Sequence, residues 1–400
     1  MTYKISGEQR RARLVSRHRL GVPADTVAGA ADAMIALHAT DPLTVYLSAW
    51  ARTRGASVAA VDIALYDDRL LVRMLGMRRT MFVVPAALAP VVQRACADDV
   101  AARLRRGLER DLARFGPGGT SAIGGTDPAP WLREAGAGTL TALAARGRAS
   151  GAELAADEPR LRTQLFAAPG KEYGGPAAVN ITSRVLMLLS AEGAIVRGHR
   201  RGGWSSGQFD WFPMESWLPG LHRTALDAAA ARVELARRWL LVFGPAPASD
   251  LQWWSGWTGA QVKAALKALP VTEVDLEGQP GVALDTDLED VPEVRPAAAL
   301  LPGLDPTPMG WQSREWFLGP HKTSLFDRSG NIGPTVWWDG QIVGGWAQRA
   351  SGEVVIRLLD DAGAEAGAAI EAKAAQLAAW LGDNRVVPRF RTPLERELSA

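Results

Sequence analysis

The residues best suited to chemistry form the polar triplet His38-Ala39-Thr40, at which an apolar, helix-like run stops. Asp41-Pro42 follows and is typical of a helix start, because Asp caps the first turn and Pro fits its first position. The triplet therefore brings an imidazole and a hydroxyl together at a helix end. An imidazole with an ordinary pKa of about 6.5 can act as a general base or hold a water, whereas a threonine hydroxyl can only hold it.

Each of these polar residues also has a structural interpretation. His38 can be a partly buried histidine that bonds a neighbouring carbonyl, and Thr40 can cap the helix that follows. Asp41 can be a catalytic acid or only the cap that precedes Pro42. The sequence leaves both interpretations open for all three residues.

The chain lacks the common motifs of nucleotide, redox and metal chemistry. No Walker loop, dinucleotide-binding glycine fingerprint, HExxH, CxxC or GxSxG occurs in it. A single Cys96 excludes an intramolecular disulfide and a Cys-based zinc site. No metal-ligand spacing relates the histidines, which are His18, His38, His199, His222 and His321. We therefore expect no metal, no nucleotide and no other cofactor.

Length and charge indicate a protein of several domains that can contact phosphates. At 400 residues the chain is long enough for two to four domains. The formal net charge is only +2, but 39 of the 45 basic residues are arginines, and clusters lie in residues 10–19, 69–79 and 103–106. Local basic surfaces suit phosphate contact, although a GC-rich genome would also enrich arginine. No apolar run approaches the roughly 20 residues of a membrane span, so we expect a cytoplasmic protein.

Three stretches read as helices followed by a two-stranded hairpin, which is the pattern of a winged helix. In the clearest, a helix over residues 181–192 ends at Gly193, and strands at 195–196 and 208–212 flank a loop over 198–207. Arg200 and Arg201 lie in this loop and are expected either to contact a DNA backbone or to be merely exposed.

The other two copies surround it along the chain. The first contains the triplet and a hairpin around residues 71–84. In the third, a capping box from Thr258 to Gln261 precedes a helix over 262–269, and strands at 271–276 and 282–284 follow. Lys263 and Lys267 share one face of this helix, where they contact DNA or only aid solubility.

After Pro292 the sequence becomes rich in strand signals. Strands are predicted at residues 298–301, 322–326, 335–338, 341–346 and 353–358, with Asp339-Gly340 as a tight turn and a final helix over 364–381. The predicted fold is thus α+β, with three tandem winged-helix units and a β-rich C-terminal module closed by a helix. We place these parts at residues 1–115, 131–222, 223–290 and 291–400, with Gly/Pro-rich connections at 116–130 and 167–176.

Five blocks, in order, resemble one known family. They are LHATDP (37–42), LVRMLGMRRTMFVV (71–84), FGPAPASDLQWWSG (243–256), LPGLDP (301–306) and NIGPTVWWDGQIVGGW (331–346). Together they look like the tandem winged-helix family that contains the AlkZ and YcaQ type DNA glycosylases, over about residues 10–382. The resemblance implies a monomer on duplex DNA in the bacterial cytosol or nucleoid. It also implies hydrolytic excision of alkylated purines, including bulky or crosslinked adducts of natural-product genotoxins, as in antibiotic self-resistance.

The catalytic motif of that family is Gln, an apolar residue, then Gln or Asp, and this chain departs from it with His38 and Thr40. An N-alkylated purine is already a good leaving group, so the enzyme needs an oriented water and stabilisation of the cationic transition state. We expect His38 and Thr40 to hold that water. The alternative is a non-catalytic winged-helix DNA-binding protein, such as a regulator or lesion sensor.

The resemblance also suggests further DNA-facing residues. Arg78, Arg79 and Thr80 begin a strand of the first wing and are expected to contact DNA. Arg79 and Thr80 are expected to face the same cavity as the triplet, or else to form a solvated strand edge. In the hairpin near the C-terminus, Trp337 and Trp338 point to opposite faces, so one belongs to the core. An outward Trp338 or Gln341 is expected to wedge into a DNA groove.

Overall fold

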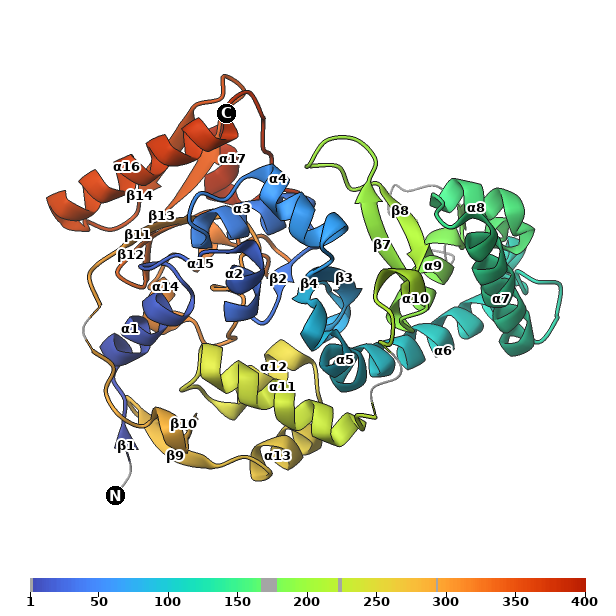
Figure 1. Ribbon diagram of the computed structural model, residues 1–400, viewed down its shortest axis with the longest axis horizontal. Helices are drawn as coiled ribbons and strands as arrows, with labels where there is room; N and C mark the ends of the chain where they lie inside the picture. Colours follow the sequence, from blue (N-terminus) through green and yellow to red (C-terminus); the bar gives the residue numbers. More distant parts are fainter. Residues whose placement is uncertain (1–2, 167–177, 222–224, 293) are drawn as a thin grey trace.

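The structure is a computed structural model that describes residues 3–166, 178–221, 225–292 and 294–400. It has mixed helices and small sheets, which confirms the predicted α+β class (Figure 1). The predicted connection at 167–176, His222 and the boundary at 222–223 fall partly or wholly outside the described residues. No helix in the described part is long and apolar enough to cross a membrane.

The first winged-helix unit carries the triplet. Its helices and strands are α2 (Val27–Ala33), β2 (Leu37–His38), α3 (Pro42–Arg52), α4 (Val58–Asp62) with a π-helical continuation (Ile63–Asp67), β3 (Leu71–Leu75) and β4 (Met81–Pro85). The strands form one sheet in the order β2-β4-β3, in which His38 pairs with Phe82. This sheet holds the end of β2 against the first wing.

The second unit repeats the same order and forms a separate lobe in Figure 1, joined to the first by α5 (Ala89–Val92) and α6 (Asp98–Arg114). It contains α7 (Pro128–Arg146), α8 (Gly151–Asp157), α9 (Thr182–Ala191), β7 (Ile195–Arg200), β8 (Phe209–Pro213) and α10 (Met214–Trp217), with a small pair of β5 (Gln164–Phe166) and β6 (Ala178–Asn180). The first unit has the short strand β2 beside its hairpin. In the corresponding place the second unit has only a β-bridge between Ala149 and Trp211. The helix predicted over 181–192 is confirmed.

The predicted loop of this second wing is too long. Residues 198–200 were expected in the loop, but they continue β7. Gly198 explains the difference, because a Cβ there would lie 2.5 Å from the Phe212 ring and 2.7 Å from that of Trp217. The missing side chain lets these two rings pack directly onto the strand, which extends the hairpin.

The third unit follows the same plan. It contains α11 (Ala228–Phe243), α12 (Ala248–Ser255), α13 (Gly259–Lys267), β9 (Val271–Leu276) and β10 (Gln279–Leu284), and the predicted capping box of Thr258 and Gln261 is present. At the N-terminus, β1 (Tyr3–Lys4) adds to this sheet beside β9, and α1 (Gly7–Arg17) follows. The first residues of the chain, which the sequence placed with the first unit, therefore pair with the third.

The C-terminal module is an antiparallel sheet covered by a helix. Its strands are β11 (Ala298–Leu301), β12 (Thr335–Trp338), β13 (Gln341–Gln348) and β14 (Val354–Leu358), and its helices are α14 (Glu315–Leu318), α15 (Lys322–Leu325), α16 (Gly363–Leu381) and α17 (Pro393–Ser399). The prediction of a strand at residues 322–326 is wrong. That segment is the short helix α15, of which only Leu325 is buried, so its side chains do not alternate between two faces as they would in a strand.

Two hydrophobic cores hold these parts together. The larger core extends from Leu14 in α1 to Leu398 in α17 and includes residues of all three winged-helix units. A smaller one packs Leu43 and Leu47 of α3 against the C-terminal sheet and Ile370 of α16. The helix that follows the triplet is therefore fixed between the first unit and the C-terminal module.

Candidate functional site

Asp41 is the cap of α3. Its Oδ1 accepts a hydrogen bond from the Leu43 amide at 3.1 Å, and its Oδ2 accepts one from the Arg389 amide at 2.8 Å. The carboxyl is 6% exposed, and burial raises its pKa. Both oxygens are engaged by backbone groups, which agrees with the structural interpretation of Asp41. The same contacts make the capping interpretation of Thr40 wrong, because Asp41 supplies the cap.

His38 ends β2 and is 6% exposed. Its ring meets the Phe82 ring edge-on, with centroids 5.4 Å apart, and its Nδ1 is buried without a hydrogen-bond partner. The structure therefore does not contain the carbonyl bond to Nδ1 that a purely structural histidine would make. Burial, and secondly the charge of Arg78, lower the pKa of His38 to about 3. The imidazole is neutral at neutral pH and keeps a nitrogen lone pair as an acceptor.

Thr40 lies between these two residues and is half-buried. Its carbonyl accepts a hydrogen bond of 3.4 Å from Nη1 of Arg389. Since Asp41 caps α3, the Thr40 hydroxyl is not used for capping. Arg389 lies far away in the sequence and was not predicted to lie beside the triplet.

Arg78 is the residue of the first wing that comes close to His38. It adopts a left-handed backbone conformation with φ of 53°, and its guanidinium carbon lies 3.8 Å from the centroid of the Trp253 ring. Arg314 lies over the same indole at 4.8 Å. Gly256 leaves the room, because a Cβ there would be 3.1 Å from Cγ of Arg78. Burial lowers the pKa of Arg78 to about 10, so it remains a cation beside His38.

Arg79 and Thr80 have other surroundings. Arg79 is exposed, with its Nη2 3.8 Å from the sulfur of Met187, and it lines a separate groove of about 390 Å³ with Arg103 and Arg184. Thr80 is half-buried just before β4. Arg79, which was predicted to face the cavity of the triplet, is directed towards α6 and α9. Its neighbour Arg78, for which this was not predicted, is the residue whose charge acts on His38.

A basic groove of the C-terminal module opens beside the triplet. It has a volume of about 970 Å³, and its basic lining residues are Lys322, Arg328, Arg389, Arg391 and Arg396. Phe326 and Phe390 contribute apolar surface, and Asp327 is the one acidic residue in its lining. Sequence reasoning missed this groove. The arginine-rich stretch at residues 385–396 was a usable signal for it.

Arg200 does not lie in the loop where the sequence placed it, whereas Arg201 does. Arg200 belongs to β7, is 8% exposed, and its Nη2 donates to both oxygens of Asp62 at 2.7 and 2.6 Å. Arg201 is exposed but forms ion pairs with Asp210 and Glu153 at 2.5 and 2.9 Å. Both guanidinium groups form ion pairs with carboxylates of the protein itself, so neither is an unpaired cation at the tip of the wing.

The loop of the second wing packs against the rest of the molecule. Trp204 donates from Nε1 to Asn384 Oδ1 at 3.0 Å, and its ring lies 5.3 Å from that of Tyr46 and 5.7 Å from that of Trp380. An indole in the loop finds aromatic partners within the chain, and this draws the loop onto α3 and the C-terminal module.

The remaining predicted DNA contacts are dispersed. Lys263 and Lys267 are exposed on α13, beside a shallow groove of about 510 Å³. Trp338 is half-buried against the smaller core, and Gln341 is exposed at the start of β13. The tip of that hairpin packs on α1, since a Cβ at Gly340 would lie 2.8 Å from Cβ of Arg11. The structure does not bring these residues to the triplet.

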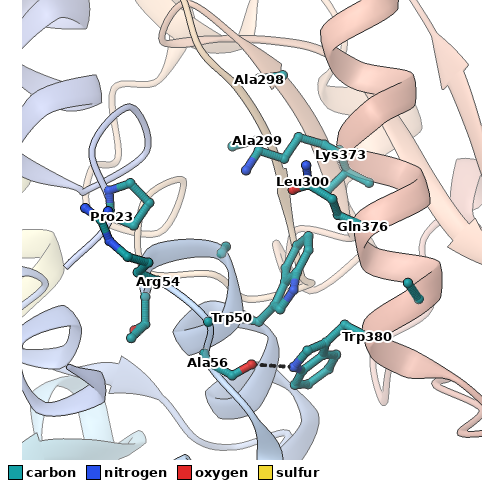
Figure 2. Close-up of a pocket in the computed structure, with 14 residues that line it drawn as sticks. Pro23, Trp50, Arg54, Ala56, Ala298, Ala299, Leu300, Lys373, Gln376 and Trp380 are labelled. Carbon is teal, nitrogen blue, oxygen red and sulfur yellow. Dashed lines mark hydrogen bonds between the residues drawn. The ribbon is translucent and has the colours of Figure 1, made fainter. Parts of the chain in front are cut away.

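A second hollow lies at the other end of α3. Figure 2 shows a cavity of about 380 Å³ between α3, β11 and α16, with the indoles of Trp50 and Trp380 on its wall and Arg54 and Lys373 at its rim. Trp380 donates to the Ala56 carbonyl at 2.7 Å. Trp50 is nine residues along the helix from Asp41, which is about 14 Å. This cavity is therefore separate from the triplet.

The described residues contain no group of three or more His, Cys, Asp or Glu side chains that could hold a metal ion. The side-chain groups at the triplet are a neutral imidazole, a hydroxyl and nearby arginines.

Comparisons with known proteins agree with this fold. The family model described as DNA glycosylase AlkZ-like matches residues 31–380. The solved structure of Streptomyces sahachiroi DNA glycosylase AlkZ is similar in fold, with a TM-score of 0.74, 20% sequence identity, and coverage of 96% of this chain and 98% of that chain. No match is found among curated proteins. Because the family model covers most of the chain, this protein belongs to the AlkZ-like DNA glycosylase family, a family of DNA N-glycosylase hydrolases.

Proposed function

We propose that this glycosylase binds duplex DNA and excises alkylated or bulky genotoxin-modified purines, crosslinks included, with a water held by His38 and Thr40. It acts as a monomer in the bacterial cytosol, at the nucleoid, and its setting is resistance to a genotoxic natural product. The observation that carries the proposal is a neutral His38 whose buried Nδ1 lacks a partner, beside Thr40 and Arg389 at a basic groove.

The proposed reaction needs little from the protein. The water oxygen attacks the anomeric carbon while the N-glycosidic bond breaks, and the bonding electrons leave with the purine, which alkylation at N7 or N3 has already made cationic. The water loses its proton to solvent after the bond has formed. A neutral imidazole accepts a hydrogen bond from the water and orients it, and the threonine hydroxyl provides a second contact. His38 thus replaces a glutamine of the family motif as a water-positioning group.

Base release from defined duplexes tests this proposal. Single-turnover rates would be measured with duplexes that contain N7-methylguanine or a bulkier N7 adduct, and DNA affinity would be measured separately. His38→Ala should lower the rate on the order of a hundredfold or more, as expected for a group that positions a reactant. His38→Gln should restore much of it, because an amide can also hold a water. His321→Ala, which removes a histidine paired with Asp360 on another surface, is the matched control.

Asp41 needs a variant of its own. Asp41→Asn keeps an Oδ1 acceptor for the Leu43 amide, so α3 stays capped, but its amide nitrogen replaces the oxygen that accepts from the Arg389 amide. If Asp41 acts only as a cap, base release should therefore fall only slightly. A large loss of rate in this variant, with normal folding, would show that Asp41 acts in the reaction. No release of any adduct by the wild-type protein, with DNA binding intact, would mean that the variant motif does not hold the water productively.

A further inference from the structure

A cluster of hydrogen-bond donors without acceptors lies between the first and second units. Arg73 of β3 is 2% exposed, and its Nε, Nη1 and Nη2 have no hydrogen-bond partner. Two more nitrogens of Arg200 and the hydroxyl of Tyr66 are buried in the same way. A guanidinium has five N–H donors and no acceptor, and a buried cation without a partner is costly. No hydrogen bond within the described residues therefore compensates the buried charge of Arg73.

Arg73 and Arg197 form the centre of this cluster. The guanidinium carbon of Arg73 lies 4.9 Å from the centroid of the Phe209 ring, and that of Arg197 lies 5.9 Å from it. Arg197 comes from β7 and also lies 5.2 Å from the Trp211 ring. Two cations from different winged-helix units thus share one aromatic support. In the described part of the chain, neither of them forms an ion pair with a carboxylate.

Arg389 connects this pair to the triplet. Burial, followed by the charges of Arg73 and Arg389, lowers the pKa of Arg197 to about 10, which places the three guanidinium groups within electrostatic reach of one another. Arg389 is exposed, bonds the Thr40 carbonyl at 3.4 Å and also lines the basic groove. The positive charge therefore continues from the groove, past the triplet, to Arg197 and Arg73.

The sheet of the first unit separates Arg73 from His38. Arg73 pairs with Val83 and His38 pairs with Phe82, which are successive residues of β4. Successive residues of a strand point to opposite faces of a sheet. The Arg73 side chain therefore lies across this sheet from the His38 imidazole.

We propose that Arg197 and Arg389, backed by the buried charge of Arg73, form a phosphate-binding site that takes a phosphodiester of the DNA strand flanking the damaged nucleotide. This inference rests on the proposed function for the identity of the DNA. Phosphate oxygens match the planar donor pattern of guanidinium groups, and Phe209 gives both cations a flat support that excludes water. Bound phosphate relieves the repulsion between Arg73, Arg197 and Arg389.

The decisive variant is Arg73→Met. A structural role for Arg73 predicts a loss of stability. The proposal predicts the opposite for the free protein, because an apolar chain of similar length replaces an uncompensated buried charge, so the melting temperature should stay the same or rise. Affinity for duplex DNA should fall on the order of tenfold, and the slope of log affinity against log salt should decrease by about one.

A second variant and a control keep the result independent of folding. Arg197→Gln alters a half-buried side chain and should lower affinity and salt slope in the same way. Arg54→Gln is the control, because Arg54 belongs to the same unit as Arg73 and is 73% exposed. Its one ion pair is long, with Nε 3.6 Å from Oδ1 of Asp25. It should leave the affinity for DNA unchanged within twofold or so.

Neutral methylphosphonate linkages, placed one at a time along the strand, identify the phosphate. One position close to the lesion should weaken binding by wild-type protein about as much as Arg197→Gln does, and should have no further effect on that variant. Inorganic phosphate is tested against chloride at equal ionic strength. If inorganic phosphate raises the melting temperature of the wild type but no single methylphosphonate linkage weakens DNA binding, the assignment to DNA is overturned.

A lower melting temperature of Arg73→Met with unchanged DNA affinity and salt slope would overturn the site altogether. These readouts concern binding only. A failure of base release would therefore contradict the proposed function without affecting them, and the two proposals can fail separately.

Discussion

Burial determines how His38 behaves at neutral pH, because it disfavours the charged imidazole. With the pKa of His38 lowered to about 3, the neutral form predominates at every pH at which the enzyme would work. We expect the rate of base release from bound DNA to stay constant between about pH 5.5 and 8. A histidine with an ordinary pKa would instead lose rate as the pH falls through about 6.5, because protonation removes the acceptor. Single-turnover base release across this range is the measurement.

His38→Gln is the control for this prediction, because an amide does not titrate in the range. A wild-type rate that falls with a midpoint near 6.5, while the variant stays flat, would contradict the prediction. The same shift affects stability. The unfolded chain binds the proton at about pH 6.5 and the folded chain only near 3, so the contribution of His38 to the free energy of unfolding falls as the pH drops below about 6.5.

At the scale of residues, the sequence predicted what depends on local contacts. The role of Asp41 as a cap follows from Asp-Pro alone, and the structure contains that cap. The neighbours of His38 depend on contacts between distant parts of the chain. Arg78 stacks on Trp253 of the third unit, and Arg389 of the C-terminal module bonds Thr40. No pattern of spacing within one segment contains such pairs.

Among the elements, the hairpin of β12 and β13 shows how a turn signal becomes a packing constraint. Asp339 and Gly340 have φ of 47° and 74°, as the Asp-Gly signal predicts. A Cβ at Gly340 would also lie 2.8 Å from Cβ of Arg11. Gly340→Ala should therefore cost about 1 to 2 kcal/mol for the left-handed backbone and about 1 to 3 more for the clash. Urea unfolding followed by tryptophan fluorescence measures the loss.

Gly330→Ala is a close control for that change. Gly330 has φ of 83°, but no atom lies within 4 Å of the Cβ position, so only the backbone cost of about 1 to 2 kcal/mol applies. Equal losses in the two variants would show that the hairpin tip does not press against α1.

Elements with both a cap and an apolar period were predicted well, and elements shaped by a partner were not. Helix α13 has its capping box, and α9 has its buried stripe. The extension of β7 depends on Phe212 and Trp217 covering Gly198, and α15 depends on Leu325 reaching the core. Short segments of this kind take their conformation from tertiary packing, which outweighs their own propensity.

In the whole molecule, the triplet lies where the first unit meets the C-terminal module, and contacts between the two position it. The strongest is a buried ion pair between Arg52, at the end of α3, and Asp305, in which both side chains are 0% exposed and Nη2 lies 2.6 Å from Oδ1. Asp305 also accepts from Ser48 Oγ at 2.6 Å and from the Thr307 amide at 2.9 Å. The helix that follows His38 and Thr40 and is capped by Asp41 is thus bonded to the module that carries the basic groove.

Removal of one partner of this pair should be far worse than removal of both. Asp305→Ala leaves the buried Arg52 cation without a counter-charge, with only the neutral acceptors Ser48 O and Thr307 Oγ1. We expect it to lower the free energy of unfolding by about 3 to 5 kcal/mol. The double change Arg52→Met with Asp305→Leu removes both charges and should recover most of that loss. Urea unfolding of the single and double variants provides the comparison. A loss below about 1 kcal/mol for Asp305→Ala would mean that Arg52 finds water or another acceptor, and that the two parts are joined mainly by their apolar cores.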